Sequence, residues 1–519
     1  MNKKNLRGAL AFAAAVLLVY FLLLVLLVLT ETGSPGSAIK GFGDALWYSL
    51  ITLTTVGYGD LYPVTNAGRL IGSAFSLMSL GLTAFLTGAV VSVLMGRLFP
   101  SLRLLVHSGK PWIILTGEEE EVLAAEGGLR KKMPDALILT PEEGQDIRAV
   151  IQKRGRSERL FIFLLGSNAG KNIKDALEYH EEAGKLFVPA TVCCRSPYGQ
   201  GILPKEILLF DEESITGRLF WQKNGLTAQE KRIILIGSGR RADTLLEQGL
   251  LYNVISPGQA LTYDVFNRKD NGSFVKNHYA LLDGAFIPDE SGDRVVFHEE
   301  AWNDDPRFWE GVSADPSACR IILCFENDDD SLSVMTELKR QFNVSCRFFL
   351  HPEENSCDLF TPEYMLQDEI NSLARALHQI YQKDASVKTS WEDLDDFRQR
   401  SNMAAADHLL MKIRILLDDK DASFTEPDPA LCERAFEKWK ELSGNPEKKE
   451  LLTDLLHTEH IRWMRFHLMN NWQYAPERDN AKRKHPLLVP FRELSEEEKA
   501  KDANSYELLG LIPAYRCCP

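Results

Sequence analysis

The chain has 519 residues and a formal net charge of -14, with 59 Lys and Arg against 73 Asp and Glu. This length allows a membrane part and two or three further domains. The excess of carboxylates argues against nucleic acid as a partner, because phosphate binding needs a basic face. The nine cysteines show no metal-binding spacing, which favours reduced thiols in a cytoplasm.

Two uncharged apolar runs mark the first hundred residues. The first extends from Leu10 to Leu29 and the second from Leu70 to Gly96, and each is long enough to cross the hydrocarbon of a bilayer. Basic residues flank both outer ends of the pair, which predicts that the N- and C-termini are cytoplasmic. We therefore expect a multi-pass protein of the plasma membrane, with residues 1–100 as its membrane domain.

The segment between these runs contains Thr54, Thr55, Val56, Gly57, Tyr58, Gly59 and Asp60. Dehydration of K⁺ requires rings of oxygen at short range, and this pattern supplies them as backbone carbonyls and the Thr55 hydroxyl. Gly57 and Gly59 permit backbone angles that let successive carbonyls face one axis. The pattern predicts a selectivity filter that binds K⁺ at Thr55, Val56, Gly57 and Tyr58. One chain gives one wall of such a pore, so we expect a homotetramer.

A short helix is expected before this segment, from Phe42 to Leu53, with the negative end of its dipole toward the filter. The order of outer helix, pore helix, filter and inner helix resembles the two-helix potassium channel family, and this resemblance implies a K⁺-selective channel. Gly81, 22 residues after Gly59, stands where inner helices of related channels often carry a hinge. A simple packing contact of a small residue is the alternative for Gly81.

Residues 101–226 alternate apolar runs of strand type with stretches of helical type. Strands are expected at Trp112 to Thr116, Ala136 to Thr140, Leu160 to Leu165, Leu186 to Val192 and Ile207 to Phe210. This alternation predicts an α/β Rossmann-like lobe with a parallel sheet. Its position after the inner helix resembles the RCK (regulator of K⁺ conductance) domains, which form gating rings under two-helix channels.

The first strand of this lobe leads into Gly117 and then into four glutamates, Glu118 to Glu121. Four carboxylates at the start of a helix would repel a pyrophosphate, so we do not expect a nucleotide at this turn. The simplest interpretation is a solvated helix start that the helix dipole favours, and a divalent-cation site is the alternative. The turn from Gly166 to Lys171 is shorter than a phosphate-binding loop and is interpreted as an ordinary connection.

A second lobe of the same type is expected over residues 227–360, and it contains the better candidate for nucleotide binding. The candidate residues are Gly237, Ser238, Gly239, Arg240, Arg241 and Asp264. The first five follow a buried strand and fit the pattern G-x-G-x-x-A, in which glycines let backbone amides approach a phosphate. Asp264 could hold a ribose. The alternative is that the glycines serve only the packing of helix against strand.

The remaining residues, 361–519, are expected to be mainly helical, with helices over Pro362 to Lys383 and Asp395 to Leu417. An ordered series of aromatic and polar residues over about 450–512 resembles the RyR domain, a module first recognised in ryanodine receptors. It comprises H-x-x-W, then N-W-x-Y and then HPLLVPF. Asn471 and Ala475 depart from the glycines usual at their positions.

Basic side chains surround this aromatic series in an otherwise acidic protein. The candidate ligand-binding residues are His460, Trp463, Trp472, Tyr474, Arg478, Lys482, Lys484 and His485. Aromatic faces beside Arg and Lys suit a ligand with a base and a phosphate. The resemblance implies a sensor of a small, nucleotide-derived ligand, and a module for assembly or protein contact is the alternative.

The sequence thus predicts a prokaryotic K⁺ channel that a cytosolic ligand gates through the RCK-like lobes, the RyR-like domain or both. A membrane-tethered, nucleotide-dependent enzyme is the alternative from another class. Such an enzyme needs a catalytic acid or base beside the Gly237 turn, and the sequence offers none there. We therefore do not expect an enzyme.

Overall fold

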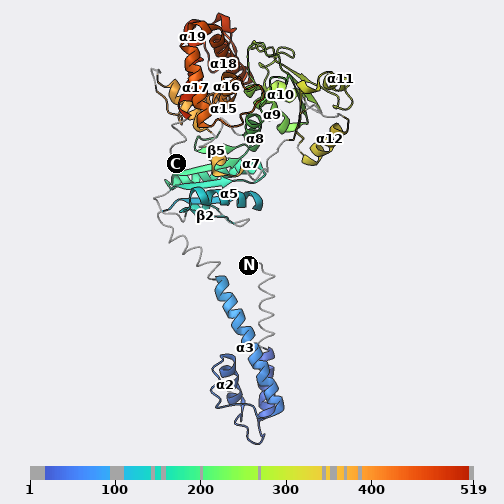
Figure 1. Ribbon diagram of the computed structural model, residues 1–519. Helices are drawn as coiled ribbons and strands as arrows, with labels where there is room; N and C mark the ends of the chain where they lie inside the picture. Colours follow the sequence, from blue (N-terminus) through green and yellow to red (C-terminus); the bar gives the residue numbers. More distant parts are fainter. Residues whose placement is uncertain are drawn as a thin grey trace. The chain divides into compact units, whose positions relative to one another are not determined.

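The structure is a computed structural model, and it describes residues 18–93, 110–141, 147–152, 159–198, 203–266, 271–325, 327–341, 347–350, 359–367, 371–383 and 388–512. The chain divides into two compact units, residues 1–108 and residues 109–519 (Figure 1).

The first unit contains a helix over residues 18–31, α2 (Phe42–Leu53) and α3 (Asn66–Val93). The bounds of α2 are those expected from the sequence. Of the helices that the structure describes, none meets the length and hydropathy needed to span a membrane. Residues 10–17 and 94–96 of the two predicted spans lie outside the described residues.

The core of this unit joins all three helices. Leu24, Leu27, Ala45 and Phe75 are among its buried side chains. The hydroxyl groups of Tyr20 and Ser49 lie 2.7 Å apart, which adds a polar contact between the first helix and α2. The predicted filter segment, residues 54–60, therefore follows a helix that packs against the other two helices of this unit.

The second unit begins with a five-stranded parallel sheet in the order β2-β1-β3-β4-β5. Its strands are β1 (Trp112–Thr116), β2 (Leu137–Leu139), β3 (Leu160–Leu164), β4 (Ala190–Arg195) and β5 (Ile207–Phe210), and its helices are α5 (Glu119–Lys132), α6 (Ile147–Gln152), α7 (Ala169–Lys185) and α8 (Glu212–Lys223). The chain leaves β1 and β3 in opposite directions along the sheet. Right-handed crossovers therefore put α5 and α7 on opposite faces (Figure 1).

A second parallel sheet of five strands follows, in the order β10-β9-β6-β7-β8. Its strands are β6 (Arg232–Ile236), β7 (Thr262–Phe266), β8 (Arg294–Phe297), β9 (Cys319–Leu323) and β10 (Arg347–Leu350), and its helices are α9 (Gly239–Tyr252), α10 (Asn271–Asn277), α11 (Pro306–Ala314), η2 (Pro316–Ala318) and α12 (Asp328–Gln341). These two sheets confirm the predicted Rossmann-like α/β regions.

The second sheet is buried on both faces, as parallel sheets usually are. Ile233 and Leu235 of β6 pack with Leu245 of α9, whereas Ile234 and Ile236 pack with α11 and α12. The alternation follows from the period of two along a strand. Burial on both faces explains why the four residues of β6 after Arg232 are all apolar.

One predicted strand is displaced. The sequence places a strand over Leu186 to Val192, but Leu186 is the C-cap of α7 and β4 begins at Ala190. Phe187 has a φ of 54° and is 84% exposed, so it belongs to a turn. Pro189 has no backbone N–H for the sheet, which explains why the strand starts after it.

The last part is helical, and two predicted long helices are each divided. Its elements are α13 (Pro362–Met365), α14 (Ser372–Tyr381), α15 (Asp396–Asp407), α16 (Leu409–Leu416), α17 (Pro429–Ser443), η4 (Pro446–Lys448), α18 (Lys449–Met469), β11 (Gln473–Tyr474), β12 (Lys484–His485), η5 (Phe491–Glu493), α19 (Glu496–Lys501), α20 (Asn504–Glu507) and η6 (Leu508–Gly510). The break between α15 and α16 falls at His408, whose imidazole Nε2 lies 2.7 Å from the carbonyl oxygen of Val254 in the second lobe. A contact outside the helix therefore accompanies this break.

Candidate functional site

The predicted filter segment leaves the C-terminus of α2 with an alternating backbone. Thr55, Gly57 and Gly59 have φ angles of 59°, 57° and 75°, in the left-handed region. The amides of Val56 and Gly57 donate to the carbonyl oxygen of Ile51 at 2.9 and 3.1 Å. Alternate left-handed residues turn successive carbonyls the same way, and all residues from 54 to 60 are exposed in the single chain. An exposed row of carbonyls is what a shared pore axis requires.

Side chains of α2 and α3 contact the filter segment and the end of α2 that leads into it. The indole nitrogen of Trp47 donates to the Asp60 carboxylate at 3.0 Å, and the rings of Trp47 and Tyr58 are stacked with centroids 6.2 Å apart. Ser79 of α3 donates to the carbonyl oxygen of Leu53 at 2.7 Å. Helices on both sides of the segment thus fix its position.

Glu31 is a structural residue that the sequence analysis missed. Its buried carboxylate accepts hydrogen bonds from the amides of Val64 and Thr65, at 3.1 and 2.9 Å, and from the Thr65 hydroxyl at 2.6 Å. It joins the end of the first helix to the start of α3. The sequence signal that could have indicated this role is a single carboxylate just after the apolar run Leu10 to Leu29.

Gly81, the predicted hinge, lies inside α3 and is exposed. A Cβ at this position would meet no atom within 4 Å. Packing within the single chain therefore does not require a glycine here. Its role as a hinge stays a prediction.

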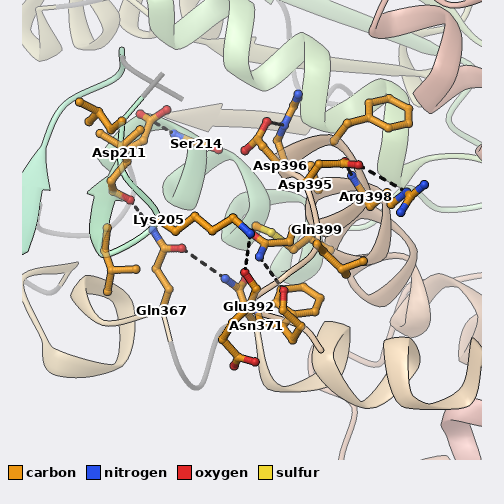
Figure 2. A pocket seen from close by; sticks show the side chains of 18 of the residues that line it. Lys205, Asp211, Ser214, Gln367, Asn371, Glu392, Asp395, Asp396, Arg398 and Gln399 are labelled. Atoms are coloured by element: carbon orange, nitrogen blue, oxygen red, sulfur yellow. Dashed lines mark hydrogen bonds and ion pairs between the residues drawn. The ribbon is translucent and has the colours of Figure 1, made fainter. Parts of the chain in front are cut away.

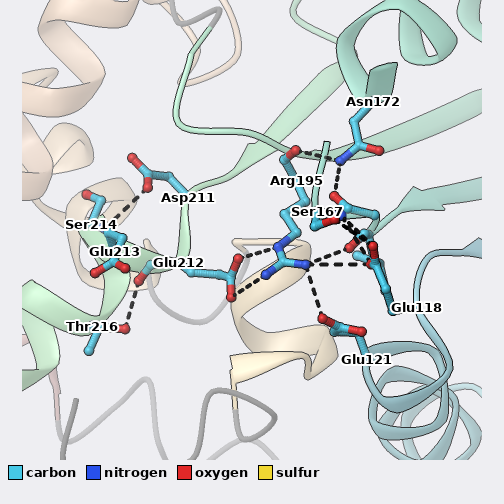
Figure 3. Close-up of polar contacts among 12 residues, drawn as sticks. Glu118, Glu121, Ser167, Asn172, Arg195, Asp211, Glu212, Glu213, Ser214 and Thr216 are labelled. Atoms are coloured by element: carbon cyan, nitrogen blue, oxygen red, sulfur yellow. Dashed lines mark hydrogen bonds and ion pairs between the residues drawn. The ribbon is translucent and has the colours of Figure 1, made fainter. Parts of the chain in front are cut away.

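In the first α/β lobe, the chain's own carboxylate occupies the turn where a phosphate would bind. Glu118 accepts hydrogen bonds from the Ser167 amide at 3.0 Å and from the Ser167 hydroxyl at 2.7 Å (Figure 3). These contacts lower the pKa of Glu118. Arg195 lies 3.9 Å from the same carboxylate and pairs with Glu121 and Glu212. The amide and hydroxyl of Ser167, beside the crevice between β1 and β3, therefore already have a partner.

The alternative of a divalent-cation site at Glu118 to Glu121 gains no support. Among the described ranges of the chain, no group of three or more His, Cys, Asp or Glu side chains is placed to hold a metal ion. Glu121 instead pairs with Arg195 at 3.2 Å.

The glycine turn of the second lobe is tightly packed. A Cβ on Gly237 would lie 2.4 Å from the carbonyl oxygen of Cys324, and Gly239, the first residue of α9, has a φ of 78°. Ser238 is the N-cap residue and makes no side-chain cap bond. Close approach to the backbone just after β9 thus gives a structural reason for Gly237, and nucleotide binding at this turn stays a prediction.

The two arginines of this turn reach the first lobe. Arg240 pairs with Asp211, and Arg241 pairs with Glu213 at 3.2 Å and donates to the carbonyl oxygen of Phe325 at 3.0 Å. Burial raises the pKa of both Asp211 and Glu213. A phosphate at this turn would have to compete with these carboxylates for the guanidinium groups.

Asp264 lies in the middle of β7 rather than at its end, and it is buried. Its carboxylate accepts hydrogen bonds from Arg232 at 2.5 Å and contacts Nε2 of His298 at 2.7 Å. A ribose could bind Asp264 only if it displaced Arg232 or His298 from the carboxylate. The ribose contact of Asp264 stays a prediction.

Four of the predicted RyR ligand residues, His460, Trp463, Arg478 and His485, line one hollow of about 400 Å³. The rings of His460 and Trp463 are stacked, and those of Trp463 and His485 meet edge to face. Burial, with the nearby Arg478 charge, lowers the pKa of His485 to about 4, so this histidine is neutral at pH 7. The hollow is therefore lined by aromatic rings and by the Arg478 guanidinium, together with Lys501 and the carboxyl groups of Glu498 and Asp502.

The other four candidates lie elsewhere. Trp472 is 5% exposed and stacks on Phe397, so it serves the core. Tyr474 is 56% exposed, and Lys482 and Lys484 line a shallow surface hollow with Arg478. The structure thus separates a residue set that the sequence pattern treats as one.

Comparisons with known proteins find family matches near both ends of the chain. Residues 11–96 match the ion channel family, and residues 441–517 match the RyR domain family. A voltage-gated potassium channel of Aeropyrum pernix is 40% identical over 77 residues, 14% of this chain and 26% of that protein. The calcium-gated potassium channel TvoK of Thermoplasma volcanium is 38% identical over 66 residues, 13% of this chain and 19% of that protein. The matched segment spans about a quarter or less of these relatives.

Among solved structures, a crystal structure of GsuK bound to ADP is similar at 15% sequence identity and a TM-score of 0.30, over 80% of this chain and 100% of that one. A GsuK channel bound to NAD is similar at 11% identity and a TM-score of 0.29, over 80% of this chain and 85% of that one. Residues 11–96 therefore form an ion channel domain with potassium channels among its relatives, and residues 441–517 form an RyR domain.

Proposed function

We propose that this chain is the subunit of a homotetrameric, K⁺-selective channel of a prokaryotic plasma membrane, with both termini cytoplasmic. The observation that carries the proposal is the alternation of left-handed residues at Thr55, Gly57 and Gly59. Such an alternation would turn the carbonyls of the segment to one side, where four copies would surround dehydrated K⁺.

Gating by a cytosolic ligand is the second part of the proposal. The RyR domain has a hollow with aromatic and cationic walls, whereas a carboxylate fills the phosphate turn of the first lobe. These observations favour the RyR domain, rather than the first lobe, as the sensor. A ligand opens or closes the pore only by the difference in its affinity for the two states.

Ion flux from liposomes that hold the purified full chain tests both parts. We expect K⁺ efflux with little Na⁺ efflux under the same gradient, and a change of K⁺ efflux on adding mono- or dinucleotides on the cytosolic side. Equal efflux of K⁺ and Na⁺ would contradict the selective pore. Selective efflux that ignores every nucleotide would contradict nucleotide gating alone and favour the RyR domain as an assembly module.

A further inference from the structure

A groove of about 920 Å³ opens in the second unit. Its lining residues fall within 196–218, 366–375, 391–403 and 470–483. Figure 2 shows the part of the lining that contains Lys205, Asn371 and Arg398. We call it the basic groove and define it by Lys205, Trp391, Phe397, Arg398, Arg478 and Arg483. The sequence analysis did not bring these residues together.

The charges of the groove are not balanced. Four carboxylates line it, and three of them already have cationic partners: Asp211 pairs with Arg240, Asp395 with Arg398 and Asp396 with Arg400. The fourth is Glu392, whose backbone carbonyl oxygen accepts a hydrogen bond from Lys205 at 2.9 Å (Figure 2).

Two guanidinium groups of the groove have only neutral partners in the described structure. Arg478 donates to the amide oxygen of Asn480 at 2.8 Å, and Arg483 donates to the carbonyl oxygen of Asn470 at 3.0 Å. Burial, together with the nearby Arg398 charge, lowers the pKa of Arg478. The charges of Arg398 and Arg478 thus lie near each other, with the Asp395 carboxylate acting on Arg478 in the opposite direction, in a protein whose net charge is -14.

The backbone of Arg483 supports a role for its side chain. Its φ of 54° lies in the left-handed region, where Gly or Asn would fit with less strain. Strained non-glycine residues occur preferentially at binding and active sites. An arginine held at this position is consistent with a need for its charge.

Aromatic faces complete the groove. Trp391 and Phe397 are half-buried and line it, and Phe397 is backed by the buried ring of Trp472 at a centroid distance of 5.0 Å. The guanidinium of Arg375 lies 5.9 Å from the centroid of Trp391. Rigid rings beside arginines suit a planar base joined to phosphate groups.

We propose that the basic groove binds a phosphate-bearing nucleotide, with the phosphates between Arg478, Arg483 and Lys205 and the base against Trp391 or Phe397. This assignment rests on the proposed ligand gating and places the ligand in the basic groove, which shares Arg478 with the hollow lined by His460 and His485. The groove touches both the RyR domain and the first lobe, so a bound nucleotide would hold these two parts together.

The test measures binding of two probes, ATP and inorganic pyrophosphate, to the purified full chain by calorimetry. We expect saturable binding of both, tighter for ATP because only ATP carries a base, and weaker for both as NaCl is raised. Loss of a charge-assisted hydrogen bond should weaken ATP binding about tenfold in Arg478→Gln and in Arg483→Asn. Asn tolerates the left-handed backbone, so Arg483→Asn isolates the loss of the charge.

Arg492→Gln is the matched control, because Arg492 is an exposed arginine of the same domain and does not line the groove. Lys205→Gln changes an exposed side chain and tests the site without risk to folding. No saturable binding of either probe, or equal affinity in all four variants, would overturn the proposal.

Ion flux separates this proposal from the channel proposal. ATP binding that depends on Arg478 without any effect on K⁺ efflux would leave the groove as a binding site and contradict ligand gating. K⁺ efflux that responds to ATP equally in wild type and Arg478→Gln would contradict the groove and leave gating in place.

Discussion

The guanidinium of Arg465 in α18 lies 2.6 Å from the carboxylate of Asp289 in the second α/β lobe, and neither side chain is exposed to solvent. Arg465 also lies 2.9 Å from Asp293 and donates to the carbonyl oxygen of Leu250. This buried group fastens the main helix of the RyR domain to the second lobe.

Replacing Arg465 with Met should lower the free energy of unfolding by about 3–5 kcal/mol, because two buried carboxylates lose their partner. Urea unfolding of the full chain measures this loss. Lys482→Ala is the control, since its pair with Asp479 is exposed and should contribute less than about 1 kcal/mol. Equal effects of the two changes would contradict a buried ionic connection.

Gly237→Ala should destabilise the protein by roughly 1–3 kcal/mol, because the new methyl group would lie against the carbonyl of Cys324. Gly127 provides the matched control, since it is helical and a Cβ there meets no atom within 4 Å. Gly127→Ala should stabilise by about 0.5–1 kcal/mol. Thermal unfolding of both variants compares them, and a neutral Gly237→Ala would contradict the packing account.

His408 should make stability depend on pH. Burial, with the nearby Lys412 charge, lowers the pKa of His408 to about 3, below its ordinary value of 6.5. The unfolded chain therefore binds a proton at His408 below pH 6.5 while the folded chain does not, and stability falls as pH falls from 6.5 toward 3.

His408→Gln removes this effect. The stability difference between wild type and the variant should shrink by about 2 kcal/mol between pH 7 and pH 5. Urea unfolding at the two pH values measures the difference. A difference that stays constant with pH would show that His408 is not held neutral.

The α/β lobes could be predicted from the sequence because their signal is local. The apolar runs of β1 and β5 have the bounds that the sequence suggested. The misplaced strand before β4 shows the limit, since the apolar residues Leu186 and Val188 belong to a turn before a proline. Burial alone does not distinguish the end of a helix from the start of a strand.

The sites were harder to predict because their contacts are not local. The bond from Arg465 to Asp289 joins residues 176 positions apart, and the basic groove is lined by residues spread along the chain from 196 to 483. The pattern of glycines after β6 indicated the turn correctly, but not that Arg240 and Arg241 would face carboxylates of the other lobe. Sequence spacing shows which groups are present, and packing decides which of them remain available to a ligand.

The central claim is that the 54–60 segment conducts K⁺, and the most direct test compares two glycine variants in liposomes. Gly57 has a φ of 57°, whereas Gly43 lies in α2 with open space around it. We predict that Gly57→Ala abolishes K⁺ efflux or its selectivity over Na⁺, because alanine disfavours the left-handed backbone that aligns the carbonyls, and that Gly43→Ala conducts like wild type. Unchanged, K⁺-selective efflux in Gly57→Ala would contradict this account.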